Sequence, residues 1–234
     1  MKIVLIFLLL PYALFALTLK EKFQKGEAGT YIVTEQNRVT SLLHLHTVNK
    51  NRLLLEEVSI PSHLVCHTDW KRWMKEGAYG HTAWILYEID LENNQITKCY
   101  SPSRNAWIST DAMESFFLPL LSLELRYLSE EKRMQSAHRL GYKPWGPPQI
   151  IHGEKMVSPE YDVYTTTWPR DNSNFSGKHI ILYFDKMQES FPFPYWIHLK
   201  GVFKFNIHAI DSGTGISSPI QDIPHRMPTF DEMK

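Results

Sequence analysis

The order in which the apolar periodicities change along this chain limits its fold more than any other feature. Apolar and polar residues alternate over residues 28–60, 80–100 and 161–210, which is the period of half-buried β-strands. Helical spacing of three to four residues appears between these runs, over residues 63–76 and again after Ser109. About nine strands, with two or three helices grouped between strand runs, predict an α+β fold. We expect a strongly curved antiparallel sheet, an open or half barrel, covered by the helices.

The helical segments carry start and stop signals. Ser62 is a good N-cap and Gly77 a good stop, so the spacing predicts an amphipathic helix from His63 to Glu76. A second helix is predicted to start at Ser109-Thr110-Asp111, with a kink or early end at Pro119. Lys132–Arg139 is predicted to be a short exposed helix.

The last strand run contains the most rigid and the most enzyme-like stretches. Two prolines in Phe191–Trp196 fix the backbone, which predicts a corner that leads into a strand. The final strand is predicted over Val202–Ile210, and Asp211–Thr214 is interpreted as the turn that ends it.

The N-terminus has the pattern of a secretory signal peptide. Lys2 is followed by a short apolar run and by Ala16, which favours cleavage after residue 16, although a retained anchor is an alternative. We therefore expect a signal peptide at 1–16, a single α+β domain at 17–215 and a Pro-containing irregular tail at 216–234. The mature protein is expected to be periplasmic or secreted.

Cys66 and Cys99 are the two cysteines of the chain. In an exported protein a disulfide between them is plausible, and two buried free thiols are the alternative. Spacing alone does not decide between them, because a bridge requires the two Cα atoms to lie close together.

Charge and aromatic content bear on the partner. The formal net charge is zero, so nothing indicates a nucleic-acid partner. The chain has seven tryptophans, and Trp107, Trp168 and Trp196 lie near predicted loops or strand ends. Such rings can form a ligand platform, although core or rim packing is the commoner role of tryptophan.

No motif is specific enough to name a reaction. Asp211-Ser212-Gly213-Thr214 matches the catalytic turn of aspartic proteases, but the chain lacks a second such motif and the strands that complete a lobe. His63 and His67 have the i, i+4 spacing of zinc ligands, without a third ligand or a Glu between them. No cofactor is expected, and no residue is assigned as catalytic.

Several segments resemble an uncharacterised family of exported proteins from chlamydia-type bacteria. They are Gly80–Trp84, Tyr87–Asp90, Trp168–Asp171, Phe191–Trp196 and Ile210–Gly213. This resemblance implies export and a common fold, and no catalytic residues. A weaker likeness, at the level of fold only, is to the periplasmic lipoprotein carriers, whose unclosed barrels hold acyl chains.

From these observations we expect an envelope or periplasmic protein that binds a lipid or acylated chain without catalysis. Trp168, Trp196 and Trp107 are the candidate ligand-binding residues. The alternatives are a structural or interaction protein that docks another envelope component, and an envelope hydrolase using zinc or residues such as His63, His67 and Asp211. The oligomeric state is left open.

Overall fold

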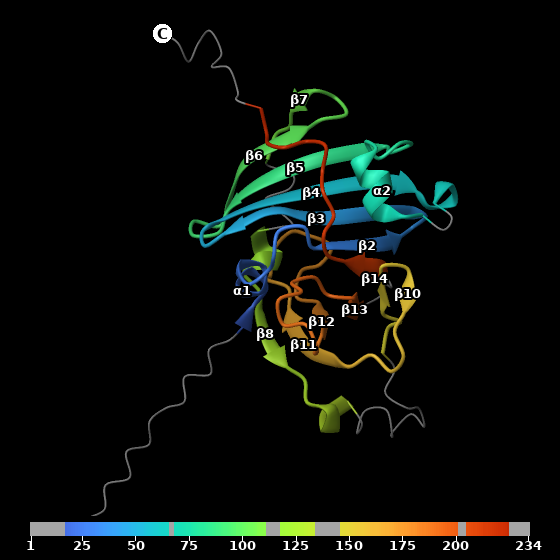
Figure 1. Cartoon of the computed structure of the whole chain (residues 1–234). Helices are drawn as coiled ribbons and strands as arrows, with labels where there is room; N and C mark the ends of the chain where they lie inside the picture. The colour runs from blue at the N-terminus through green and yellow to red at the C-terminus, as the bar shows by residue number, and fades with distance from the viewer. Residues whose placement is uncertain (1–16, 66–67, 111–117, 134–145, 201–204, 225–234) are drawn as a thin grey trace, which may run out of the picture.

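The computed structural model describes residues 17–65, 68–110, 118–133, 146–200 and 205–224. Antiparallel strands dominate it and the helices are short, so the predicted α+β class with a curved antiparallel sheet is confirmed (Figure 1). None of the helices in these residues has the length and apolar character that a membrane-spanning helix requires.

Most strands of the first half of the chain form a meander, in which each strand pairs with the next, whereas the short first strand pairs with the second half. Its elements are β1 (Leu17–Thr18), α1 (Leu19–Gln24), β2 (Tyr31–Gln36), β3 (Val39–Asn49), β4 (Arg52–Pro61), η1 (Ser62–Leu64), α2 (Trp70–Lys75), β5 (Ala83–Asp90), β6 (Gln95–Ser101) and β7 (Ala106–Trp107). The predicted strands at 28–60 and 80–100 are confirmed with small shifts at their ends. Asn37 and Arg38 both have positive φ, 51° and 67°, as a tight hairpin turn between β2 and β3 requires.

The second half supplies the other side of the sheet. Its elements are β8 (Glu124–Tyr127), β9 (Ile150–Ile151), β10 (Glu154–Lys155), β11 (Tyr161–Thr167), β12 (His179–Asp185), β13 (Trp196–Lys200) and β14 (Phe205–Gly213). β9 and β10 form a small hairpin of their own, and the other strands join the main sheet. The Phe191–Trp196 corner leads into β13 as predicted, and Phe191 and Phe193 are buried.

One 12-stranded sheet joins the two halves, in the order β1-β8-β11-β12-β13-β14-β2-β3-β4-β5-β6-β7. The junction is the antiparallel pairing of β14, near the end of the chain, with β2, near its start. Figure 1 shows the strands of the second half running steeply across those of the first, so the sheet bends at this junction. β1 and β7 are its two edges within the described residues.

Each face of the sheet carries its own hydrophobic cluster. The face inside the bend, here called the inner face, packs α1 and both halves of the sheet around residues such as Leu45, Leu55 and Leu182. The opposite, outer face of the first half is covered by α2, through Trp70 and Met74. It is also crossed by residues 214–224, here called the C-terminal strap, which appears red in Figure 1. Adjacent residues of β2 therefore face different cores: Ile32 lies in the inner cluster and Tyr31 in the outer one.

The helix predicted from His63 to Glu76 begins later than expected. Ser62–Leu64 form only a 3-10 turn, and α2 starts at Trp70 with Asp69 as its N-cap, whose carboxylate accepts from the Arg72 N–H at 3.1 Å. Its end is as predicted, because Gly77 adopts a φ of 91° and its N–H bonds to the Met74 carbonyl.

The other predicted helices fall mostly outside the described residues. Residues 118–121 are helical with Pro119 inside this turn, whereas residues 111–117 are not described. Residues 130–133 are helical, and the rest of the segment to Arg139 is not described. The elements without a counterpart among the predictions are the short strands β1, β7, β8, β9 and β10, and α1, which Thr18 and Glu21 start with a reciprocal capping box.

Asp211–Gly213 are not a turn that ends the last strand, so this prediction is wrong. These residues lie inside β14, where Asp211 pairs with Val33 and Gly213 with Tyr31. The pairing with β2 extends the strand beyond Ile210, because backbone groups beside a neighbouring strand bond to it rather than turning away.

Candidate functional site

A β-bulge in β14 determines where Asp211 points. The register shifts between Ala209, opposite Thr34, and Asp211, opposite Val33. In a regular strand Asp211 would share the inner face with Ala209, because side chains alternate. The bulge places Ile210 and Asp211 on the outer face instead, and bulges re-aim side chains in this way.

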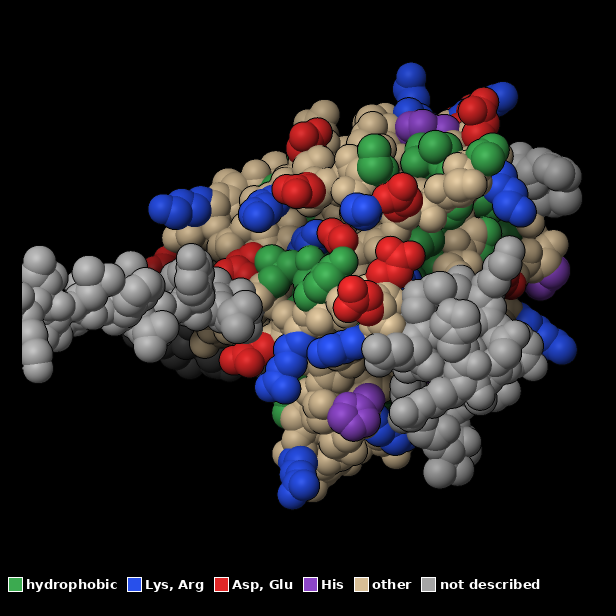
Figure 2. Space-filling model, turned by 90° about the horizontal axis from the view of Figure 1, so that it is seen from below, with side chains coloured by type: hydrophobic (Ala, Val, Ile, Leu, Met, Phe, Trp, Pro, Cys, Tyr) green, Lys and Arg blue, Asp and Glu red, His purple; other side chains and the backbone are tan. Residues whose placement is uncertain are grey.

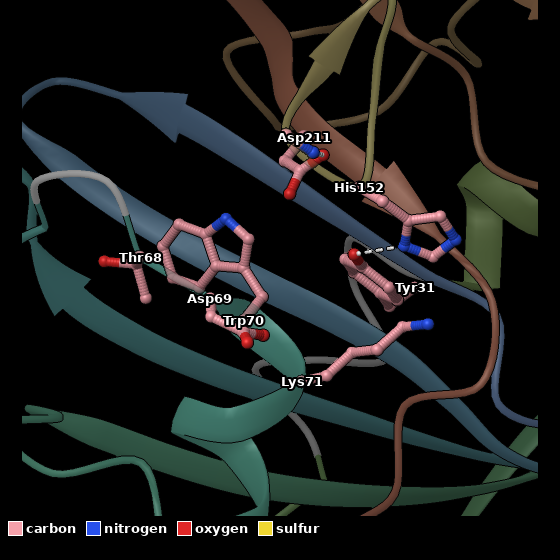
Figure 3. Close-up of a pocket in the computed structure, with 8 residues that line it drawn as sticks. Tyr31, Thr68, Asp69, Trp70, Lys71, His152 and Asp211 are labelled. Atoms are coloured by element: carbon pink, nitrogen blue, oxygen red, sulfur yellow. Dashed lines mark hydrogen bonds between the residues drawn. The ribbon is translucent and has the colours of Figure 1, made fainter.

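The Asp211 carboxylate lies in a pocket on the outer face with a volume of about 500 Å³. β2, α2, the β9–β10 hairpin and β14 supply the lining (Figure 3). We call it the Asp211 pocket, lined by Tyr31, Thr68, Asp69, Trp70, Lys71, His152, Gly153 and Asp211.

Asp211 is held by the backbone on one side only. Its Oδ1 accepts from the Gly153 N–H at 3.0 Å and from the Ser212 N–H at 2.8 Å. Its Oδ2 has no hydrogen-bond partner among the described residues, and Figure 3 shows one carboxylate oxygen turned into the open space. Asp211 is only 5% exposed. Burial raises the pKa of this carboxyl, and the two N–H donors and nearby His152 act against that rise.

His152 enters the pocket from an unusual backbone position. His152 and Gly153 have φ of 52° and 80° at the tip of the β9–β10 hairpin, a conformation that non-glycine residues seldom adopt. The His152 N–H donates to the Ser212 carbonyl at 2.9 Å, which fixes the hairpin tip on β14. The imidazole packs directly over Gly213, where any Cβ would overlap the ring.

Tyr31 contacts His152 and lies within electrostatic range of the Asp211 and Asp69 carboxylates. Its hydroxyl lies 3.3 Å from His152 Nδ1. Burial raises the pKa of Tyr31, and the negative charges of Asp211 and then Asp69 raise it further. The phenol therefore stays protonated at neutral pH and acts as a hydrogen-bonding group rather than as a nucleophile.

Ser212 anchors the opposite side of the same strand. The Tyr195 hydroxyl lies 2.8 Å from Ser212 Oγ, which donates to the Ile150 carbonyl at 2.7 Å. Tyr195 belongs to the Phe191–Trp196 corner, so this corner contacts the strand that carries Asp211 through the Tyr195 hydroxyl. Asp211, Ser212 and Gly213 each make a contact that joins β14 to the β9–β10 hairpin. One backbone bond, two bonds between a side chain and the backbone, and the packing of His152 on Gly213 therefore fix this wall of the pocket.

The predicted tryptophan sites are not brought together. Trp168 is buried, at 2% exposed, and its Nε1 donates to Asp171 Oδ2 at 2.8 Å, so its ring lacks an open face. Trp196 on β13 is half-buried and stacks on His198, with ring centroids 5.0 Å apart. Trp107 on β7 packs against Tyr100 and lines a different pocket of about 550 Å³. A Trp168–Trp196 rim is therefore absent from the described surface.

Of the cysteine and histidine candidates, the two that the structure describes, Cys99 and His63, do not line the Asp211 pocket. Cys99 is a buried free thiol in the described structure, and burial, followed by the charge of Glu57, raises its pKa to about 11. Cys66 and His67 lie outside the described residues, so the Cys66–Cys99 bridge stays a prediction. His63 is exposed in η1. No group of three metal-binding side chains occurs in the described part of the chain.

Sequence reasoning reached only part of this site. Asp211 was singled out by its motif, although as a turn residue. His152 was missed because its flanking strands are two residues each, too short for periodicity to reveal. The one local signal is the dipeptide His152-Gly153 between Ile151 and Glu154, which resembles the Asn-Gly pattern of tight hairpins.

Comparisons with known proteins identify the family. The family model of the CT021 protein matches residues 41–157. The chain belongs to the CT021 protein family. This confirms the expected membership in an uncharacterised family of chlamydia-type bacteria.

A solved structure gives the same fold. The hypothetical protein CT021 from Chlamydia trachomatis superposes with a TM-score of 0.67 and 18% sequence identity, covering 90% of this chain and 98% of that one. At this identity the likeness establishes the fold alone. No curated protein matches the chain, and neither match in the CT021 family supports the likeness to lipoprotein carriers.

Proposed function

We propose that this CT021-family protein is an exported, non-catalytic binding protein whose Asp211 pocket holds a small polar molecule. One observation carries the proposal. Two backbone N–H groups fix one oxygen of the buried Asp211 carboxylate, and its other oxygen faces a pocket of about 500 Å³. The second oxygen faces the open space of the pocket, where it can accept a hydrogen bond from a ligand donor. Preformed pockets with a few fixed polar groups are typical binding sites.

Binding is favoured over catalysis by the state of the polar groups. The Tyr31 hydroxyl is hydrogen-bonded to His152 and its raised pKa keeps its proton in place. Asp211 is constrained by backbone donors that act to keep it ionised. Both groups are suited to orienting a ligand, whereas covalent catalysis needs an activated nucleophile beside a base.

Export is part of the same proposal. The first described strand, β1, begins at Leu17, the residue directly after the predicted cleavage site, and pairs with Leu125. The support for export is the signal-peptide pattern in the sequence of residues 1–16. N-terminal sequencing of the protein from the envelope fraction tests this: a chain that begins at Leu17 supports export, and one that keeps Met1 contradicts cleavage.

An acyl chain as ligand remains an expectation with less support. The apolar cavity beside Trp168 measures about 10 Å³, which is room for about one water molecule. A lipid would have to enter through a larger opening than this cavity provides. Docking of another envelope component likewise remains a proposal, and Figure 2 shows acidic and basic side chains interspersed on the face it presents.

A thermal-shift screen tests the binding proposal. The mature chain is heated with a panel of amines, carboxylates, amino acids, peptides and sugars, because a ligand that binds only the folded state raises Tm. We expect a hit whose shift is lost in Asp211→Asn and kept in Glu154→Gln, a matched exposed carboxylate beside the same hairpin tip. A ligand that raises the Tm of Asp211→Asn as much as that of the parent would show that it binds elsewhere on the protein.

A further inference from the structure

We propose that the Asp211 pocket is selective for a compact zwitterion, a molecule that carries a primary ammonium and a carboxylate, with an unblocked dipeptide as the best fit. This inference rests on the proposed binding function and names the chemistry of its ligand. The argument comes from the two oppositely charged groups that line one pocket without neutralising each other, Asp211 and Lys71.

The acidic end of the pocket suits an ammonium group. Asp211 is 5% exposed, and its Oδ2 lacks a partner among the described residues while Oδ1 is fully engaged. Asp69 adds a second negative charge close enough to affect Tyr31. The indole of Trp70 and the ring of Tyr31 lie beside these carboxylates (Figure 3). Carboxylates beside aromatic rings are a favourable environment for an organic cation.

The basic end is provided by Lys71. Its side chain is half-buried in the pocket wall and extends beside the C-terminal strap, with Nζ 3.6 Å from the position that a Cβ on Gly215 would take. No ion pair involves Lys71 in the described part of the chain, whereas the neighbouring Arg72 pairs with Glu76. An ammonium held at a pocket without a carboxylate partner is suited to receive an anionic ligand group.

The Tyr31 hydroxyl lies between the two charged ends in Figure 3. We place the middle of the ligand beside the Tyr31–His152 pair, where the peptide group of a dipeptide offers both a donor and an acceptor. A fully extended dipeptide spans about 7 Å, and a pocket of about 500 Å³ has room for it. A simple amine would leave Lys71 without a partner, and a simple carboxylate would be repelled by Asp211.

Calorimetric titration with blocked and unblocked peptides tests the inference on the mature chain. Glycylglycine is compared with N-acetylglycylglycine, which lacks the ammonium, and with glycylglycine amide, which lacks the carboxylate. We expect each block to weaken binding about ten- to a hundredfold, the range for loss of one charged hydrogen bond. Free alanine, whose two charges are close together, is the arm that separates a single amino acid from a dipeptide.

Two variants connect each end of the ligand to its residue. Asp211→Asn should weaken the binding of glycylglycine as much as acetylation of the peptide weakens its binding to the parent protein. The acetylated peptide should bind to this variant with little further loss of affinity. Lys71→Met should likewise weaken the binding of glycylglycine as much as amidation of the peptide does. Lys75 is an exposed lysine on the same helix, and Lys75→Met should bind glycylglycine as the parent does. Asn keeps an acceptor for the Gly153 N–H, and a circular dichroism melt verifies that each variant is folded.

The outcomes separate the inference from the proposed function. Equal affinity for glycylglycine and both blocked peptides, or for a simple amine, overturns the zwitterion while leaving a polar binding pocket in place. Alanine that binds more tightly than glycylglycine keeps the zwitterion and identifies a single amino acid as the ligand. An absence of binding by every member of the thermal-shift panel overturns the proposed function itself.

Discussion

Gly213 is the residue on which the geometry of the Asp211 pocket depends most directly. The His152 imidazole occupies the space in which a side chain at this position would begin. We expect Gly213→Ala to displace the β9–β10 hairpin, break the contact between Tyr31 and His152, and lower the free energy of unfolding by about 1–3 kcal/mol, the usual cost of overpacking. Urea denaturation measures the loss.

A double-mutant cycle separates this clash from a general effect of alanine in β14. Asn tolerates the left-handed backbone of position 152 and removes the ring. Gly213→Ala should therefore cost clearly less in a His152→Asn background than in the parent. Equal costs in both backgrounds would contradict a role for the imidazole.

The ionisation of Asp211 should be visible in the pH dependence of stability. Its pKa is raised above the usual value of 3.8 in the folded state, mainly by burial. A carboxyl whose pKa is raised in the folded state binds its proton more tightly there than in the unfolded chain. The free energy of unfolding therefore falls as the pH rises from about 3.8 through the folded pKa. The parent should lose stability over this window relative to Asp211→Asn, by about 1.4 kcal/mol for each tenfold difference between the acid dissociation constants of the unfolded and folded states.

The measurement is a series of urea denaturation curves between pH 3 and pH 7 for both proteins. A difference between them that stays constant across the series would show that Asp211 has the same pKa folded and unfolded. Glu154→Gln, which removes one exposed carboxylate beside the same hairpin tip, is measured alongside as the comparison for loss of one negative charge.

At this scale the sequence singles out one residue of the site, Asp211, and does not predict where its side chain points. Alternation along the last strand correctly places Ala209 in the core. Beyond it the bulge adds one residue, so period-two reasoning assigns Asp211 to the wrong face. A bulge depends on the pairing with β2, and that pairing leaves no mark in the sequence of β14 alone.

Among the elements, the C-terminal strap shows how a segment without helix or strand is fixed. Ile216 and Ile223 are buried against the outer face, and the Ser218 hydroxyl donates to Glu56 Oε1 at 2.7 Å. Glu56 is fully buried and also accepts from Trp84 Nε1 and contacts His44 Nδ1, at 2.7 and 2.8 Å. The strap thus supplies one of the hydrogen-bond donors to the buried Glu56 carboxylate, and this bond holds the irregular segment on the outer face.

Removal of the Ser218 hydroxyl should loosen the strap. Ser218→Ala takes one donor from Glu56 and the acceptor from the Ile220 N–H. We expect a loss of about 1–3 kcal/mol, because the bond lost involves a buried carboxylate. Limited proteolysis should also cut residues 214–224 faster than in the parent.

Ser217→Ala is the matched control, since Ser217 is exposed and adjacent. This variant should unfold and be cleaved as the parent is. If Ser218→Ala behaves like Ser217→Ala, the strap is held by Ile216 and Ile223 alone and the contact with Glu56 contributes little.

For the molecule as a whole, local patterning predicts the strands and leaves their long-range order open. The strands from β2 to β6 and from β11 to β14 follow the alternation of apolar residues closely. Hairpin partners are neighbours in the chain, and turn residues such as Asn37 mark them. The pairing of β14 with β2 has no such local cause, because it joins segments that are distant in sequence and compete with many other edges. The inner core and the Asp211 pocket both depend on it.

The shared inner core predicts that both halves of the sheet unfold together. Leu182 on β12 is fully buried in the same cluster as Leu45 and Leu55 on β3 and β4. Leu182→Ala should cost about 2–5 kcal/mol, the usual cost of a cavity in a core. If the sheet is one cooperative unit, this loss should speed amide hydrogen exchange in β3–β5 as well as in β11–β13. Asn172→Ala, in an exposed loop, should leave both regions unchanged. Faster exchange confined to β11–β13 would show instead that β14 joins two independently stable units, and the pocket between them would then open without unfolding either one.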